Sequence, residues 1–367
     1  MGIENLVDRK GGIRPSLHIV AKTIPEAWEK ALFAVWENGI SVETDYDVKE
    51  VGEPPSKEAA VLITITNPLK EPRIHKRGIP EGLDSLQKYI MEVCDGIHDH
   101  WVNVTQQNGT TVWDYSYHQR LFNYPVFDAE GNLIRTINQV EDLMQKLEKE
   151  RHLTKSAQAI TWIPSKDHKA GHSPCLQRIH LRLIPAEERG REIIKYALNM
   201  DAIFRSRDDK NALHENISAF VELMKRFADE LTRRIGIEVI VGAYSDFSDS
   251  LHVYGRDFNP NVMLPSKGVT KYEDFMNFLD KTRKMSWTEK TWRSDDPVVV
   301  NMMREEEIAL LADPDYTRRG GIAARPKIIY DGEGNPIGAE HEKGKLLYKE
   351  GKMYLPDGKL YKPELIL

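Results

Sequence analysis

Hydrophobic and polar positions alternate with a period of two in two stretches of the chain. In residues 177–183 three aliphatic side chains share one face, and three polar side chains share the other. Residues 198–207 show the same alternation, with Arg205 and Arg207 on the polar side. Successive side chains of a strand point to opposite faces of a sheet. Both stretches are therefore predicted to be strands with one buried face.

A helical period of apolar positions predicts a second class of element. Thr23, followed three residues later by Glu26, has the spacing of a capping box, and Gly39 is placed to end this helix in a left-handed conformation. An apolar stripe along residues 217–231 predicts a long amphipathic helix that Asn216 opens. Two more helices are expected near residues 83–93 and 140–147.

Short apolar, β-branched runs predict further strands. They lie at residues 17–20, 60–66, 239–241 and 251–254, and a hairpin is expected over residues 126–136. Strands mixed with helices indicate an α/β or α+β fold. After Pro326, three runs recur at about seven residues, each ending in turn-prone residues, which is typical of a small β-meander. We therefore expect a main domain over residues 1–294 and a β-rich C-terminal extension over residues 295–367.

Composition and charge narrow the function classes. The 367 residues are 40% hydrophobic and 29% charged, which is typical of a globular protein with a sizeable core. The same composition argues against a membrane span. The formal net charge of −6 argues against general nucleic-acid binding, although a few arginines can still hold one phosphate. The first residues show no signal peptide, and two cysteines are too few for a disulfide framework. We expect a cytoplasmic protein with reduced thiols and no metal site.

Candidate chemistry begins at Cys175. It follows Pro174 where a polar loop enters a predicted strand, a position suited to an exposed thiol near cationic groups that lower its pKa. Taken alone, one cysteine is more often a small core residue. Thirty residues later, Arg205-Ser206-x-Asp208 offers a guanidinium and a hydroxyl for a phosphate, although such a run alone is more often a solvated strand end.

Two further positions suit ligand binding. His252 and Tyr254 stand two apart on a predicted strand, so both point to one face and can reach one ligand. Each can instead be a satisfied core residue. Asn216 stands at the head of its predicted helix, where the alternative role is a simple N-cap.

Taken in order, these motifs resemble the thymidylate synthase and pyrimidine nucleotide hydroxymethylase superfamily. The matching motifs are Pro174-Cys175, Arg205-Ser206-Arg207-Asp208, Asn216 and His252-Val253-Tyr254. Residues 249–258 are also similar to phage deoxycytidylate hydroxymethylases. Upstream, Glu92, the pair Trp113-Asp114, Tyr117 and Trp162 fall at the family's spacings. The resemblance spans about residues 17–258 and is nearest in style to the archaeal-type branch.

The resemblance implies a fold, a reaction and partners. It implies a homodimer built on a mixed β-sheet with flanking helices, a pyrimidine nucleoside monophosphate as substrate, and 5,10-methylenetetrahydrofolate or a modified folate analogue as cofactor. A Cys175 thiolate would add to C6 of the pyrimidine and make C5 nucleophilic. Catalytic roles are implied for Cys175, Glu92, Tyr117 and Asp208, substrate binding for Arg205, Ser206, Asn216, His252 and Tyr254, and cofactor binding for Trp113 and Asp208.

The chain departs from the family pattern in three places. Leu176 replaces the histidine that usually follows the nucleophile, and Lys155 stands where paired arginines normally reach the phosphate of the other subunit. Lys155, Arg151 or Arg178 would have to substitute for those arginines. The chain also continues past the usual C-terminal segment, and its ending, residues 364–367, does not obviously match that segment.

Three functions remain open at the level of sequence. The leading one is thymidylate synthase, which converts dUMP to dTMP, and the alternative is a dUMP, CMP or dCMP hydroxymethylase. Asn216 favours uracil, because an amide can both donate to O4 and accept from N3–H. A non-catalytic nucleotide- or RNA-binding relative is the third, and the presence of both Cys175 and Arg205 disfavours it.

Overall fold

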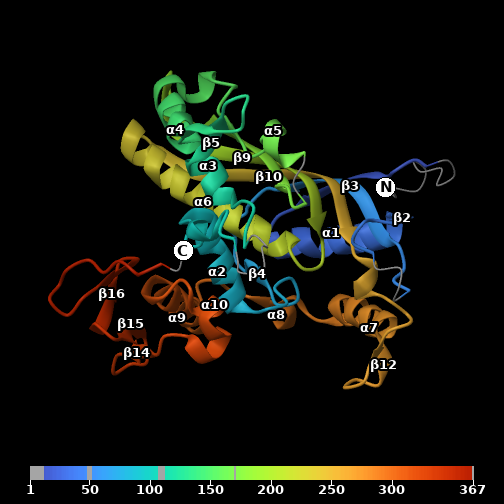
Figure 1. Ribbon diagram of the computed structural model, residues 1–367. Helices are drawn as coiled ribbons and strands as arrows, with labels where there is room; N and C mark the ends of the chain where they lie inside the picture. The colour runs from blue at the N-terminus through green and yellow to red at the C-terminus, as the bar shows by residue number, and fades with distance from the viewer. Residues whose placement is uncertain (1–11, 48–51, 106–111, 169–170, 366–367) are drawn as a thin grey trace. The chain divides into compact units, whose positions relative to one another are not determined.

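The computed structural model describes residues 12–47, 52–105, 112–168 and 171–365 (Figure 1). The expectations about the N-terminal residues 1–11 and the last two residues of the chain therefore lie outside the described residues. The chain divides into two compact units. The first comprises Met1–Pro80, Asp142–Ile160 and Cys175–Trp292, and the second comprises Glu81–Glu141, Thr161–Pro174 and Arg293–Leu367. The expected boundary between a main domain and a C-terminal extension, after residue 294, stays a prediction.

A seven-stranded mixed sheet forms the centre of the first unit. Its strands are β1 (Ser16–Ala21), β2 (Ile40–Val42), β3 (Ser56–Ile65), β7 (Gln158–Ile160), β8 (Leu176–Arg189), β9 (Glu192–Asp208) and β10 (Glu238–Val253). The strand order is β1-β3-β10-β9-β8-β7, with β2 paired to β3. The pairs β1–β3 and β9–β10 are parallel, and the others are antiparallel. The predicted strands of residues 177–183 and 198–207 are confirmed as parts of β8 and β9.

Helices α1 (Ile24–Asn38) and α6 (Leu213–Ile235) pack against this sheet and against each other. Thr23 caps α1 as predicted, since its side chain accepts a hydrogen bond from the Glu26 N–H. The prediction for Gly39 is wrong: its φ of −64° is extended, not left-handed. Glycine is needed there because a Cβ would lie 2.5 Å from the Val35 carbonyl oxygen and 3.0 Å from that of Glu58.

Residues 238–253 form one strand, whereas the sequence predicts two short strands separated by a polar run. Asp246 and Ser248 from that run are almost fully buried in β10. The register of β10 shifts between Val241 and Tyr244 and again between Ser248 and Leu251, so bulges absorb the irregular spacing. Buried polar side chains in the middle of a strand hide its continuity from a hydrophobicity pattern.

The remaining elements of the first unit are short, apart from two helices. They are β4 (Ile74–His75), η3 (Arg151–Leu153), η4 (Gly255–Asp257), β11 (Met263–Leu264), β12 (Val269–Thr270), α7 (Lys271–Lys284), α8 (Trp287–Lys290) and β13 (Thr291–Trp292). The predicted helix of residues 140–147 is confirmed as α4 (Gln139–Glu150).

The second unit combines helices with two small sheets. Its helical elements are α2 (Leu83–Cys94), η2 (Asp99–Trp101), α3 (Tyr117–Phe122), α5 (Pro164–Asp167), α9 (Pro297–Ala312), α10 (Tyr316–Gly320) and η5 (Gly321–Ala324). The predicted hairpin is confirmed as β5 (Tyr124–Phe127) and β6 (Leu133–Ile137). The C-terminal sheet consists of β14 (Ile328–Tyr330), β15 (Pro336–His341), β16 (Gly344–Lys349) and β17 (Lys352–Tyr354).

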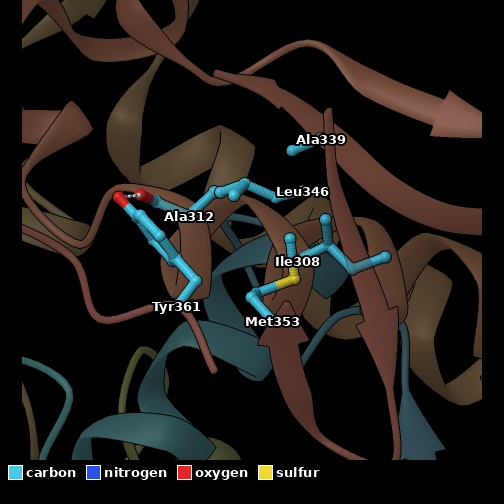
Figure 2. Close-up of a cluster of buried hydrophobic side chains, with 6 residues drawn as sticks. All are labelled: Ile308, Ala312, Ala339, Leu346, Met353 and Tyr361. Atoms are coloured by element: carbon cyan, nitrogen blue, oxygen red, sulfur yellow. Dashed lines mark hydrogen bonds between the residues drawn. The ribbon is translucent and has the colours of Figure 1, made fainter. Parts of the chain in front are cut away.

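The C-terminal strands form the predicted antiparallel meander, in the order β14-β15-β16-β17. The third sequence run adds only a single bridge, between Leu360 and Tyr354. Figure 2 shows the core of the meander, made of Ile308, Ala312, Ala339, Leu346, Met353 and Tyr361. The Tyr361 hydroxyl donates a hydrogen bond to the Ala312 carbonyl at 3.0 Å, and α9 also packs on α2.

The predicted fold class is confirmed, because a central mixed sheet with flanking helices is accompanied by a small C-terminal β-rich element. No helix among the described residues combines the length and apolar character that crossing a bilayer requires.

Candidate functional site

Cys175 and Arg205 lie side by side at one end of β8 and β9. Cys175 directly precedes β8 and is partly exposed. Its carbonyl oxygen accepts a hydrogen bond from the Arg205 N–H at 2.8 Å. Two motifs thirty residues apart in sequence are thus joined through the backbone of neighbouring strands.

The third motif lies on the next strand of the sheet. In the parallel pair β9–β10, Ser206 lies opposite Ser250 and Asp208 opposite His252. The histidine and the Arg-Ser-x-Asp run therefore lie side by side on β10 and β9, and the cysteine lies at the start of the next strand, β8.

The rings of His252 and Tyr254 lie next to each other, and their shared role in binding one ligand stays a prediction. Their ring centroids are 4.3 Å apart, although Tyr254 lies just beyond the end of β10. Burial, with a smaller contribution from the charge of Asp208, raises the pKa of Tyr254 to about 12. The phenol therefore stays protonated at neutral pH and can donate a hydrogen bond.

The buried side chain of His252 has one nitrogen ready for a ligand. Its Nδ1 lies 3.3 Å from the Ser250 carbonyl oxygen, which can only accept, so this contact favours a proton on Nδ1. Burial lowers the pKa of His252, which keeps the ring neutral. Its Nε2 has no hydrogen-bond partner among the described residues and is left as an acceptor.

A cavity of about 290 Å³ opens beside these groups. Its lining residues are Glu43, Thr44, Asp45, Tyr46, Ser206, Ser250, His252 and Tyr254. The lining is rich in hydroxyls and carboxylates and contains neither lysine nor arginine. Such a surface suits the hydroxyl groups of a sugar, whereas a phosphate would need the neighbouring Arg205.

Asp208 carries a carboxyl group that keeps a proton more readily than usual. Burial is the largest cause of its raised pKa, and hydrogen bonds from Asn211 oppose that effect. The Asn211 N–H and side-chain amide each donate to Asp208 at 2.9 Å. The side chain is therefore fixed in orientation.

Asn216 is 7% exposed and is the fourth residue of α6, because the helix begins earlier than the sequence predicts. The N-cap is Ala212, and the Asn216 N–H donates to the Ala212 carbonyl oxygen within the helix. The capping alternative for Asn216 is therefore wrong.

Arg207 is buried, which corrects its prediction on the polar face with Arg205. Only 3% of it is exposed, and its Nη1 donates to the Asp246 carboxylate at 3.1 Å. Its guanidinium also lies 4.2 Å from the centroid of the Phe204 ring. The alternation of buried and exposed side chains along β9 therefore ends at Phe204. Arg207 is buried because the buried carboxylate of Asp246 on β10 pairs with it.

Arg178 and Lys155, the proposed substitutes for the cross-subunit arginines, do not line the sugar-sized cavity. Arg178 donates to the Gln158 side chain at 3.0 Å, and the exposed Lys155 offers its carbonyl oxygen to His180 at 3.1 Å. Both lie at β7 and β8.

Glu92, Trp113 and Tyr117 belong to the second unit, and two of them meet at His98. His98 is fully buried, with Nδ1 2.8 Å from Glu92 Oε1, and its ring meets that of Trp113 edge to face with centroids 5.8 Å apart. Tyr117 begins α3 and lies beside Tyr115, with ring centroids 5.8 Å apart.

His98 is held through both of its ring nitrogens. Its Nε2 lies 2.9 Å from the Pro314 carbonyl oxygen, which can only accept, so Nε2 carries a hydrogen and donates. Its Nδ1 faces the Glu92 carboxyl group, and the two contacts fix the orientation of both side chains. The sequence predicts Glu92 but assigns no role to His98, because its partner Pro314 is 216 residues away.

Comparisons with known proteins agree with the ordered motifs. A Methanocaldococcus jannaschii protein named "Putative thymidylate synthase" is 26% identical over 251 residues, covering 66% of this chain and 93% of that protein. A protein of the same name from Methanosarcina acetivorans is 25% identical over 245 residues, covering 66% and 91%. No protein-family model matches the chain.

The solved structure of thermostable thymidylate synthase A from Bacillus subtilis matches with a TM-score of 0.44 and 13% sequence identity, covering 73% of this chain and 85% of that one. The sequence similarities support the resemblance: over about two thirds of its length the chain is similar to proteins named as thymidylate synthases.

Proposed function

We propose that this protein transfers a one-carbon unit from a folate to C5 of a pyrimidine nucleoside monophosphate, with conversion of dUMP to dTMP as the leading reaction. The observation that carries the proposal is the arrangement of His252 on β10, Arg205 on β9 and Cys175 directly before β8, at neighbouring positions of one sheet. The thiol would react with the base of a nucleotide, the cation would bind its phosphate, and the polar cavity would hold its sugar.

Each part of the nucleotide has a partner in the first unit. The guanidinium of Arg205 and the hydroxyl of Ser206 would hold the phosphate. A sugar hydroxyl would donate to the free Nε2 of His252 and accept from Tyr254, whose raised pKa keeps its proton in place. Asp208 and Asn216 would hold the edge of the base.

The chemistry assigned to Cys175 activates the pyrimidine. Addition of the thiolate to C6 moves the electrons of the C5–C6 double bond toward the O4 carbonyl, so C5 becomes a nucleophile. Loss of the C5 proton and departure of the thiolate later restore the double bond. Glu92, oriented by its contact with His98, would serve proton movement through water, together with Tyr117.

The residues proposed for the cofactor fit a folate in kind. Trp113 is a partly buried indole, which can stack on a flat ring, and Asp208 is a half-buried carboxyl that can bind ring N–H groups. A methylene-carrying folate would supply the one-carbon unit and, where the product is a methyl group, also the hydride that reduces it.

A test by product mass separates the candidate reactions. The protein is incubated with UMP, dUMP, CMP or dCMP and methylenetetrahydrofolate, and each product is weighed by mass spectrometry. A methyl gain on dUMP is the result that we expect, and a hydroxymethyl gain identifies the alternative enzyme. No change in any of the four nucleotides, with saturable binding of one of them, would point instead to a non-catalytic binding protein.

We also propose that the protein is a homodimer. Alternate positions of the central sheet carry large aliphatic side chains that are 37–53% exposed, namely Val20, Leu62, Ile160, Ile184 and Ile240. A sheet face with this many exposed aliphatic groups favours association with a second copy. Analytical ultracentrifugation tests the proposal, and a monomer at micromolar concentration would contradict it.

A further inference from the structure

A second cavity of the first unit, about 430 Å³ in volume, is basic. Its lining residues are Arg77, Pro80, Lys210, Asn211, Arg256, Asp257, Leu264, Lys267, Lys271, Asp274, Phe275 and Phe278. Five basic and two acidic side chains give this lining a net charge of +3, although the whole chain has a net charge of −6. The volume lies within the range of about 300–1,000 Å³ that is usual for ligand pockets.

Three of the five cations have no carboxylate partner among the described residues. Lys267 pairs with Asp274 at 2.9 Å, and Lys210 pairs with Asp257 at 3.3 Å. Both carboxylates of the lining are thereby engaged. Arg77, Arg256 and Lys271 remain, so the cavity has charge left for an anion from solution.

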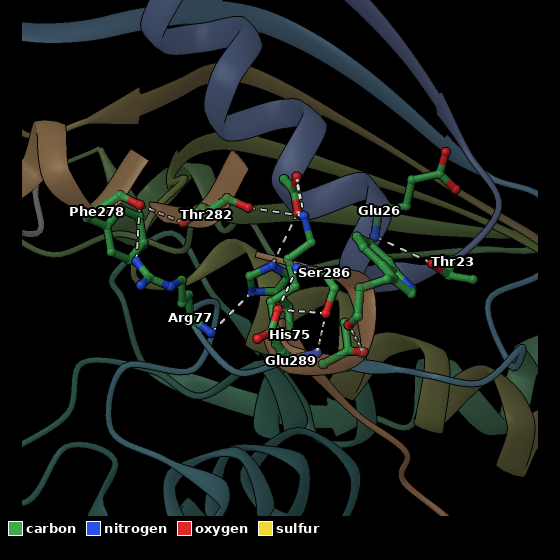
Figure 3. A network of polar contacts seen from close by, with 12 residues as sticks. Thr23, Glu26, His75, Arg77, Phe278, Thr282, Ser286 and Glu289 are labelled. Atoms are coloured by element: carbon green, nitrogen blue, oxygen red, sulfur yellow. Dashed lines mark hydrogen bonds and ion pairs between the residues drawn. The ribbon is translucent and has the colours of Figure 1, made fainter. Parts of the chain in front are cut away.

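Arg77 is held in place before any ligand arrives. Its N–H donates to His75 Nδ1 at 3.1 Å, and its Nη1 donates to the Phe278 carbonyl oxygen at 3.0 Å, as Figure 3 shows. Its guanidinium also lies 4.9 Å from the centroid of the Phe278 ring. Partial burial lowers the pKa of Arg77, which means that its charge is poorly solvated. A bound anion would relieve that cost.

The basic cavity adjoins the proposed nucleotide site without sharing a lining residue with the sugar-sized cavity. Asn211 lines the basic cavity, and its amide donates both to Asp208 at 2.9 Å and to Asp257 at 3.3 Å. Arg256 lies 4.4 Å from the centroid of the Tyr254 ring. One hydrogen-bonded residue and one stacked arginine therefore separate the two cavities.

We propose that this basic cavity binds a polyanion, a small molecule with two or more carboxylate or phosphate groups. Several fixed cations spread around one cavity match several negative groups on one ligand better than a single ion. The apolar surfaces of Leu264, Phe275 and Phe278 would contact the carbon skeleton of such a ligand.

The test is calorimetric titration of the full-length protein with tripolyphosphate and, separately, with citrate, at constant ionic strength. Saturable binding of at least one of them is expected, and the tighter of the two shows whether phosphate or carboxylate groups are preferred. The solution contains no nucleotide, so the result is independent of the proposed reaction. Absence of saturable binding of both anions would overturn the proposal.

Variants of α7 localise the binding. Lys271→Gln removes one unpaired cation of the lining and should weaken binding about tenfold, whereas Asp274→Asn removes a negative charge and should strengthen it. Lys281→Gln makes the same charge change on the same helix outside the lining and should leave the affinity unchanged. Equal effects of Lys271→Gln and Lys281→Gln would show that the anion binds elsewhere. Thermal unfolding of each variant checks that it is folded.

Discussion

Asp209 follows Asp208 in the sequence and is fully buried. Neither of its carboxyl oxygens has a hydrogen-bond partner among the described residues. Burial raises its pKa well above the ordinary value, the charge of Asp208 raises it further, and Arg207 opposes the change. The folded protein therefore keeps a proton on Asp209 that the unfolded chain loses above about pH 4.

This proton predicts how stability depends on pH. Above about pH 4 the folded state binds one more proton at Asp209 than the unfolded state, so this group costs about 1.4 kcal/mol of stability per pH unit up to its folded pKa. Asp209→Asn removes that dependence. The stability of the variant relative to wild type should therefore rise from pH 4.5 to pH 7, as measured by urea unfolding.

A matched substitution provides the control for Asp209. Asp229 is exposed on α6, and Asp229→Asn should leave the pH dependence unchanged. If Asp209→Asn shows the same pH dependence as wild type, the carboxyl group is not held protonated.

Asn216 offers a test of base recognition. Asn216→Asp should lower activity on dUMP and raise relative activity on dCMP, because a protonated carboxyl offers the donor that N3 of cytosine needs. Since Ala212 is the N-cap, a changed preference cannot come from a changed cap. The ratio of kcat/KM for the two nucleotides is the measurement, and an unmoved ratio would remove Asn216 from the base site.

At the level of elements, Gly39 joins α1 to β2 at a point where two backbones nearly touch. Gly39→Ala should destabilise the protein by about 1–3 kcal/mol, because its Cβ would collide with carbonyl oxygens that cannot move freely. Gly332→Ala is the control, since nothing lies within 4 Å of its added Cβ. Equal urea midpoints for the two variants would contradict the close approach.

Periodicity predicts elements whose buried face is apolar. It predicts α1 and α6 because their apolar stripes pack on the sheet, and it predicts β8 because that strand alternates. It misses the continuity of β10 because Asp246 is buried against Arg207, which lies 39 residues away. A polar residue that is buried by a distant partner leaves no local signal.

The sequence predicts those parts of the candidate site that belong to short local motifs. Cys175, Arg205 and His252 belong to short motifs with family spacings, and in the structure they lie at or directly before neighbouring strands. His98 has no such signal, because its role depends on Pro314 in the C-terminal region. The basic cavity around Lys271 likewise combines segments that are separate in sequence.

At the scale of the molecule, the C-terminal region is part of the second unit's core. Asp315 is fully buried, and its carboxylate accepts from Trp101 Nε1 at 2.6 Å and lies 2.9 Å from His100 Nε2. Trp101 in turn stacks on His98, with ring centroids 3.8 Å apart. The residues around Glu92 are therefore supported by Asp315, which lies in the C-terminal part of the chain, beyond the residues that resemble the family.

Asp315→Ala tests this support. Two buried donors would lose their acceptor, so the free energy of unfolding should fall by about 2–5 kcal/mol in urea titrations. Asp280→Ala breaks an exposed pair with Lys284 and should cost about 0.3–0.5 kcal/mol. Similar losses for the two variants would show that the C-terminal contacts contribute little.

The central claim is that the Cys175 thiolate makes C5 of a pyrimidine nucleotide reactive. Release of tritium from C5-labelled dUMP and dCMP in the presence of methylenetetrahydrofolate measures that step, whichever product forms. Wild type and Cys94→Ser, which changes a buried cysteine on α2, should release tritium from at least one nucleotide, and Cys175→Ser should release none. Release by Cys175→Ser at the wild-type rate, or no release by wild type from either nucleotide, would contradict the account.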